Sequence, residues 1–244
     1  MNATAISTSS RSTNPRGQPA NAAAGLRLSR IEKSFGSNRV LRGIDLDIDP
    51  GSFVAIIGKS GCGKSTLIKV IAGVYRAAPG AEISYFGESV AQPTPQLARR
   101  MGVAVIWQDL ALFPEMSVAE NIAFFGRLFG QGARERKRRI AELAAATGLA
   151  PFLDRPAKKL SGGMKQKLGL CCCLIHDPDL LILDEPTTGV DPLSRRQFWD
   201  LIDRIRARRP GMSVAVATAY MEEAERFDWL AALNDGKVIG SGAP

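Results

Sequence analysis

The stretch Gly58-Lys59-Ser60-Gly61-Cys62-Gly63-Lys64-Ser65 follows the apolar run from Phe53 to Ile57 and precedes a second apolar run. A strand, a glycine-rich loop and a helix in this order match the phosphate-binding pattern G-x-x-x-x-G-K-[ST] in full. The three glycines lack a Cβ, so the backbone can curl with its N–H groups around an anion. A helix beginning near Lys64 adds the positive end of its dipole. The stretch therefore predicts a nucleoside triphosphate site.

Two side chains of this loop carry specific expectations. Lys64 is expected to reach the β- and γ-phosphates, and the hydroxyl of Ser65 to bind Mg²⁺. The alternative is a glycine-rich turn of no chemical meaning, but the strand, the lysine and the hydroxyl are all in place. The residues expected to hold the nucleotide here are Gly58, Ser60, Gly61, Cys62, Gly63, Lys64, Ser65 and Thr66.

Length and composition indicate one sizeable domain. The chain has 244 residues, of which 45% are hydrophobic, enough for a proper core and a smaller subdomain. A net charge of +8 permits an acidic partner such as phospholipid head groups or RNA, although many soluble proteins are equally basic. No run approaches the ~20 apolar residues of a membrane-spanning helix, so a membrane role would come from a partner. Residues 1–24 predict a disordered tail, and residues 25–244 the domain.

Later in the chain the apolar run Leu180-Leu181-Ile182-Leu183 is followed by Asp184 and Glu185. Such a run is typical of a buried parallel strand, whose carboxyl end opens on the crevice where α/β sheets bind ligands. Asp184 is expected to hold Mg²⁺, and Glu185 to polarise the attacking water. Two acids at a strand end can also cap a helix, but the phosphate loop earlier in the chain favours the catalytic interpretation.

Other segments complete the outline. Leu26-Arg27-Leu28 and Ile44–Ile48 alternate with period two, which predicts half-exposed antiparallel strands. Between them lies Phe35, a possible platform for an adenine ring, although an isolated phenylalanine more often belongs to a core. Residues 80–90 predict a hairpin, and residues 103–107 a buried strand that ends at Gln108.

From Asp109 the pattern becomes helical. Ser117-x-x-Glu120 is a capping box. A second helix is expected from about Ala133 to Thr147, where Gly148 ends it. This helix is dense in arginine and lysine, which is more simply a solvated face than a lipid or RNA contact.

The segment Leu160-Ser161-Gly162-Gly163-Met164 lies between the phosphate loop and the acidic strand end, and with them it resembles the nucleotide-binding domain of the ABC ATPase family. The resemblance covers about residues 26–242. It matches the family's Walker A loop to Gly58–Ser65, its glutamine loop to Gln108, its signature to residues 160–164, its Walker B strand to residues 180–185 and its D-loop to Gly189-Val190-Asp191. It implies an α/β fold, namely a P-loop NTPase core with a mostly parallel sheet, an antiparallel β subdomain and a helical subdomain at about residues 109–165.

The resemblance also implies how the site works. Two domains would sandwich ATP and Mg²⁺ head to tail, with Ser161, Gly162, Gly163 and Asp191 of one domain closing on the nucleotide of the other, whose adenine rests on Phe35. The catalytic residues would be Glu185, Gln108 and Lys64, and the Mg²⁺ ligands Ser65, Gln108 and Asp184. The implied partners are a second nucleotide-binding domain, in another copy or in the same longer chain, and a transmembrane permease. DNA is not expected as a partner, and the location would be cytoplasmic, at the inner face of the membrane.

Two positions depart from the family pattern. Met164 stands where the signature usually has glutamine, and Ala219 stands where the switch histidine is expected after the strand Ser213–Thr218. Losing a preorganised hydrogen-bond donor of this kind commonly costs ~10²–10³ in rate. The single histidine, His176, precedes the acidic strand at its amino end and therefore cannot substitute. ATP binding is expected, but fast hydrolysis by this chain alone is not.

Three functions follow from the resemblance. The leading one is the energy-coupling ATPase of an ABC-type exporter, because residues 160–195 and Ala219 look most like the first nucleotide-binding domain of ribosome-associated ABC ATPases fused to drug-exporter-type membrane regions. The second is a ribosome-bound ATPase, which the basic helix favours. The third is a degenerate dimerisation module with weak hydrolysis, which Ala219 favours.

Overall fold

The computed structural model describes residues 25–244, so the tail expected over residues 1–24 lies outside the described part. Its centre is a six-stranded sheet in the order β10-β9-β3-β8-β7-β6. All neighbouring strands pair in parallel except β9 and β10, which confirms the mostly parallel sheet. The strands are β3 (Phe53–Ile57), β6 (Val103–Ile106), β7 (Leu180–Asp184), β8 (Ser213–Thr218), β9 (Trp229–Asn234) and β10 (Lys237–Gly242).

The antiparallel subdomain is a separate four-stranded sheet in the order β2-β1-β4-β5. Leu26 lies opposite Ile48 and Leu28 opposite Leu46, so the residues that alternate in the sequence share the buried face. The predicted strands are confirmed, and the first two extend well beyond the short periodic stretches that indicated them. The strands are β1 (Leu26–Phe35), β2 (Asn38–Ile48), β4 (Glu82–Tyr85) and β5 (Glu88–Val90).

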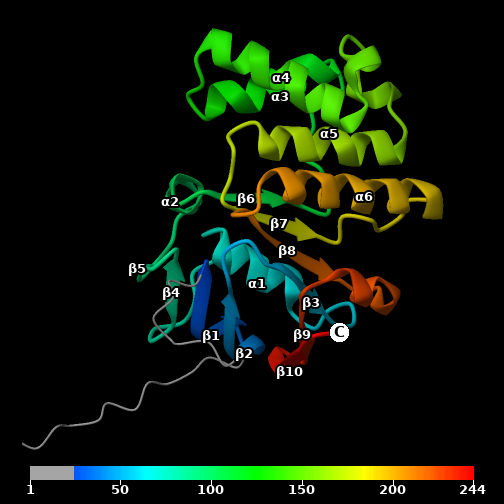
Figure 1. The fold of residues 1–244 in the computed structure, drawn as a ribbon. Helices are drawn as coiled ribbons and strands as arrows, with labels where there is room; N and C mark the ends of the chain where they lie inside the picture. The colour runs from blue at the N-terminus through cyan, green and yellow to red at the C-terminus, as the bar shows by residue number, and fades with distance from the viewer. Residues whose placement is uncertain (1–24) are drawn as a thin grey trace, which may run out of the picture.

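The helices form layers on both sides of the central sheet (Figure 1). Helices α5 (Gly162–Leu174) and α6 (Pro192–Arg208) cover one face, and α3 (Val118–Leu128) and α4 (Ala133–Thr147) lie beyond α5. On the other side, α1 (Lys64–Ile71) lies between the central and the antiparallel sheet. The remaining short elements are α2 (Pro95–Arg100) and the 3₁₀ turns η1 (Ala150–Phe152), η2 (Ala157–Lys159) and η3 (Met221–Arg226).

Local signals place the helix ends correctly. The capping box at α3 is complete, because Ser117 Oγ accepts from the Glu120 N–H and the Glu120 carboxylate accepts from the Ser117 N–H. Helix α4 spans the predicted residues and ends at Gly148, whose φ of 74° favours glycine. On the basic face of α4, Arg138 pairs with Glu135 and Glu142. These exposed pairs support the interpretation as a solvated face.

Strands β3, β6, β7, β8 and β9 of the central sheet each contribute to two cores. Phe53, Ala55 and Ile57 of β3 face the helices α5 and α6, whereas Val54 and Ile56 face α1 and the antiparallel sheet. Strand β7 is buried along its whole length, as its apolar run predicts. Within residues 25–244 no helix combines the length and the apolar character that crossing a bilayer requires.

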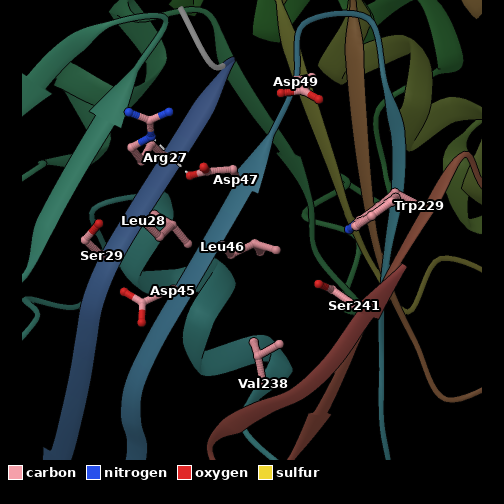
Figure 2. Close-up of a pocket in the computed structure, with 10 residues that line it drawn as sticks. All are labelled: Arg27, Leu28, Ser29, Asp45, Leu46, Asp47, Asp49, Trp229, Val238 and Ser241. Carbon is pink, nitrogen blue, oxygen red and sulfur yellow. Dashed lines mark hydrogen bonds and ion pairs between the residues drawn. The ribbon is translucent and has the colours of Figure 1, made fainter. Parts of the chain in front are cut away.

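A cavity of about 300 Å³ lies where the antiparallel sheet meets the outer strands of the central sheet (Figure 2). Its wall includes Asp45, Asp47, Asp49 and Trp229. Asp47 forms an ion pair with Arg27 at 3.2 Å. None of the motif residues lines this cavity, so it is separate from the predicted phosphate site.

His176 lies at the amino end of β7, away from Asp184, as predicted. Its ring stacks on Phe129 with 3.7 Å between the centroids. Both ring nitrogens are buried without a hydrogen-bond partner. Burial, helped by the nearby Arg99 guanidinium, lowers the pKa of His176 to about 4, so the ring is neutral at pH 7.

We expect His176 to make the fold acid-sensitive. Because its pKa lies below the usual 6.5, the unfolded chain binds the proton more tightly, and stability is lost as the pH falls from 6.5 towards about 4. The full shift, reduced for partial exposure of the ring, corresponds to roughly 2 kcal/mol. His176→Phe keeps the stacked ring without the charge. Urea unfolding at pH 7 and pH 4.5 should show a smaller loss for this variant, and equal losses would contradict the assignment.

Candidate nucleotide-binding site

The phosphate loop leaves β3 in a conformation that requires glycine. A Cβ on Gly58 would lie 2.3 Å from the carbonyl oxygen of Leu233, and Gly63 has a φ of 113°. Ser60 and Gly61 are exposed at the tip of the loop. The side chain of Cys62 is buried, so this residue can offer only its main chain to a ligand. Thr66 is half-buried in the first turn of α1.

Lys64 is buried at the start of α1, with 3% of the residue exposed. Its Nζ donates to the carbonyl oxygens of Gly58, at 2.7 Å, and Lys59, at 3.1 Å. The same Nζ lies 3.5 Å from Oε1 of Glu185. The ammonium group is therefore folded back over its own loop, where a phosphate would offer it a stronger anionic partner.

Ser65 and Asp184 come together from α1 and β7. The Ser65 hydroxyl donates to Oδ1 of Asp184 at 3.0 Å. Burial raises the pKa of Asp184, and the hydrogen bond from Ser65 opposes this shift. A hydroxyl and a carboxylate oxygen are ligands that suit Mg²⁺. The residues present thus fit the predicted metal, and Asp184 and Ser65 are the side chains that would hold it.

Gln108 follows β6 at the same edge of the sheet, because Ile106 of β6 pairs with Leu183 of β7. Its side chain is exposed and makes no hydrogen bond within the described residues. Gln108 therefore lies at the same edge as Asp184 but has no hydrogen bond with Ser65 or Asp184.

Glu185 stands one residue beyond β7 with a φ of 49°. This left-handed conformation turns the chain sharply at the strand end, and the Glu185 N–H donates to the Ala217 carbonyl oxygen of β8 at 2.9 Å. Its carboxylate accepts from Thr188 Oγ1 at 3.3 Å. Thr188 is a contact that the sequence patterns do not indicate.

Phe35 ends β1 and keeps 44% of its surface exposed. Its ring contacts Tyr75 edge to face, with 5.2 Å between the centroids, and Lys33 Nζ lies 5.2 Å from the Phe35 ring. An exposed aromatic ring that a neighbouring ring supports can stack against a nucleotide base such as adenine. Tyr75 escapes sequence analysis because it lies 40 residues from Phe35 in the chain.

The signature segment opens α5. Ser161 is the N-cap, and its hydroxyl accepts from the Met164 N–H at 3.3 Å. Asp191 caps α6 in the same way by accepting from the Ser194 N–H at 2.9 Å. The two helix starts touch, since a Cβ on Gly163 would lie 2.9 Å from Ser194. Helix N-termini of this kind attract anions.

The helix starts that carry Ser161 and Asp191 lie on the same side of the molecule as the strand ends that carry Asp184 and Thr218. The amino ends of α5 and α6 and the carboxyl ends of β7 and β8 lie on the right in Figure 1. Among the described residues, however, neither Ser161, Gly162 nor Asp191 has a hydrogen bond or ion pair with the Lys64 loop. Ala219 follows β8 at this side, is exposed, and has no donor to offer a phosphate.

The comparisons with known proteins find relatives along most of the chain. The family model described as ABC transporter matches residues 41–188. An sn-glycerol-3-phosphate import ATP-binding protein of Rhizobium johnstonii is 39% identical over 88% of this chain and 57% of its own length. The Nod factor export ATP-binding protein I of Paraburkholderia xenovorans is 37% identical over 91% of this chain and 71% of its own. The chain thus spans only part of these relatives, and their names give no support to ribosome association.

Solved structures match the fold closely. The ADP conformation of an ATP-binding cassette of an ABC transporter superposes with a TM-score of 0.82 and 24% identity, covering 91% of both chains. A component of the cbiONQ ABC transporter complex of Clostridium perfringens gives the same TM-score and identity over 91% of this chain and 89% of its own.

Replacing Lys64 tests the phosphate loop. Lys64→Ala removes the only side-chain cation buried in the loop, and we expect MgATP affinity to fall at least about tenfold, or ~1.4 kcal/mol. Lys59→Ala, an exposed neighbour, is the matched control and should bind within about twofold of wild type. Isothermal titration calorimetry measures both, and unchanged affinity in Lys64→Ala would refute the assignment.

Proposed function

The chain belongs to the ABC transporter family of ATP-binding domains, and from this premise we propose that it hydrolyses MgATP to drive an ABC-type exporter. The observation that carries the proposal is the meeting of Lys64, Ser65, Asp184 and Glu185 at one edge of the central sheet. These groups supply a phosphate-binding cation, two oxygen ligands for Mg²⁺ and a carboxylate for the attacking water.

In this proposal Glu185 acts as the base only after ATP has bound. Its carboxylate now faces the Lys64 ammonium at 3.5 Å. A γ-phosphate that draws Lys64 towards itself leaves Glu185 free to accept a proton from water. Bound Mg²⁺ supplies charge neutralisation for the phosphates, and Ser65 and Asp184 are the residues that would hold it.

A second domain would complete the site. Since neither Ser161 nor Gly162 has a hydrogen bond with the Lys64 loop of its own chain, the amino end of α5 would be available to a triphosphate held by another domain. Two such contacts would clamp two nucleotides between two domains. The clamp would drive transport because its closed state binds ATP better than ADP.

Ala219 sets the expected rate. A methyl group at the end of β8 donates no hydrogen bond to the γ-phosphate, which supports slow hydrolysis by this site alone. A partner domain with a complete site would then supply most of the turnover, whether that domain is a separate chain or part of a longer one.

A permease segment would dock between the subdomains. A groove of about 240 Å³ lies between α2, β6, α3 and α5, and its wall includes Trp107, Phe125, Phe129 and His176. A smaller hollow of about 110 Å³ beside it also includes Trp107. Because Gln108 follows Trp107, a segment seated here would lie next to the residue proposed to sense the nucleotide. We place the protein at the inner face of the membrane for this reason.

Export is the proposed direction of transport. It is supported by the Nod factor export proteins, of which this chain covers up to 71%, whereas it covers 57% of the sn-glycerol-3-phosphate import protein. The test uses inside-out membrane vesicles from a strain that overproduces the chain with its permease. ATP-dependent uptake of the substrate into these vesicles would support export, and its absence would contradict it.

Dimer closure is testable without transport. Glu185→Gln should bind MgATP without hydrolysing it and therefore accumulate as a closed dimer on light scattering. Adding Gly162→Asp should abolish that dimer, because the carboxylate repels the γ-phosphate of the partner. The space beside Gly162 is open, so the new side chain causes no clash. A dimer that persists in the double variant would contradict the clamp.

Restoring the histidine tests the role of position 219. Ala219 is exposed, so Ala219→His can be accommodated, and we expect turnover to rise about tenfold or more with little change in ATP affinity. Steady-state phosphate release measures this rise. No increase would locate the cause of slow hydrolysis elsewhere in the site.

A further inference from the structure

Glu223 is a buried carboxylate that the proposed hydrolysis does not use. It lies in η3, directly after β8, with 4% of the residue exposed. Within residues 25–244 it forms no ion pair with a lysine, arginine or histidine. Burying a carboxylate without a cation is unfavourable unless other groups hydrogen-bond to it.

Three side chains supply those hydrogen bonds, one from α6, one from β8 and one from the turn after β7. Trp199 Nε1 of α6 donates to Glu223 Oε1 at 2.8 Å, and Thr187 Oγ1 donates to the same oxygen at 3.2 Å. Thr218 Oγ1 of β8 donates to Oε2 at 3.3 Å. All three donors are themselves buried. The carboxylate is therefore the meeting point of α6 and of the ends of β7 and β8.

Each donor stands close in sequence to a group of the nucleotide site. Thr187 follows Glu185 by two residues, and Thr218 immediately precedes Ala219. Trp199 belongs to the helix that Asp191 caps. A displacement of the Glu223 carboxylate would consequently move both Glu185 and Ala219.

We propose that Glu223 is a positioning residue that holds the end of β8 in register with Glu185. It acts through Thr218 and Thr187 and does not touch the nucleotide. This role rests on the proposed ATPase function. It matters more here because Ala219 cannot fasten the end of β8 to a γ-phosphate, which leaves the buried carboxylate as the side-chain link between the two strand ends.

The kinetic test removes the Thr218 hydroxyl, which donates to Glu223 and accepts from the Tyr220 N–H, and leaves the carboxylate in place. Thr218→Val in the full chain should lower kcat about fivefold or more while the MgATP dissociation constant stays within about twofold of wild type. Thr147→Val is the matched control, because Thr147 is also buried and also hydrogen-bonded, but in α4. It should lose a similar amount of thermal stability and keep kcat. An unchanged kcat in Thr218→Val, or an equal loss in Thr147→Val, would overturn the proposal.

Glu223 itself is tested by two replacements. Glu223→Gln keeps a side-chain oxygen that can accept from Trp199, and it should retain more of kcat than Glu223→Ala at the same nucleotide affinity. Equal kcat in the two variants, measured below the melting temperature of both, would show that the acceptor does not position the site.

A spectroscopic test does not depend on hydrolysis. With Trp107→Phe and Trp229→Phe, Trp199 is the remaining tryptophan of the three in the chain. MgATP should shift the fluorescence emission of Trp199, because Glu223 links its indole ring to the end of β8. Thr218→Val should abolish this shift. The proposal would be overturned if MgATP caused no emission shift in the single-tryptophan chain with Thr218 intact. An equal emission shift after Thr218→Val would overturn it too. If the chain binds MgATP but hydrolyses none, the proposed function fails, and this measurement still decides the role of Glu223.

Discussion

The buried ammonium group of Lys64 is the constraint on which the site depends. It lies at the start of α1, where the helix dipole is already positive, and it is nearly inaccessible to water. Such a charge needs anionic or carbonyl partners, which Gly58, Lys59 and Glu185 provide. The loop that offers its carbonyl oxygens and the strand end that offers Glu185 must therefore stay fixed relative to one another.

The parallel sheet satisfies this requirement. Strand β8 pairs with both β3 and β7, so the phosphate loop and the acidic strand end emerge at the same edge, separated by one strand. The sheet is rigid because it is buried on both faces, by α5 and α6 on one side and by α1 with the antiparallel sheet on the other. The proposed site thus lies at an edge of the sheet whose geometry follows from two cores.

The proposed site contains the cation, the hydroxyl and the two carboxylates expected of a nucleotide site, and it lacks the histidine expected at position 219. Lys64 contacts Glu185 and Ser65 contacts Asp184, whereas Ala219 leaves the end of β8 without a side-chain donor. The buried cluster around Glu223 links the same strand ends from inside the protein. In the proposed function, the nucleotide would bind at the loop of Lys64, and the buried hydrogen bonds of Glu223 would hold the strand ends beside it.

The amino-acid sequence alone determined the features that local spacing encodes. These are the phosphate loop, the buried run ending in Asp184, the capping box of Ser117 and Glu120, and the end of α4 at Gly148, each of which depends on residues within a few positions of one another. Only the tertiary structure decided the contacts of Glu223 with Thr187 and Trp199, of Phe35 with Tyr75 and of His176 with Phe129. These partners are 24 to 47 residues apart in the chain, and side-chain packing between separate elements, which no periodicity records, brings them together.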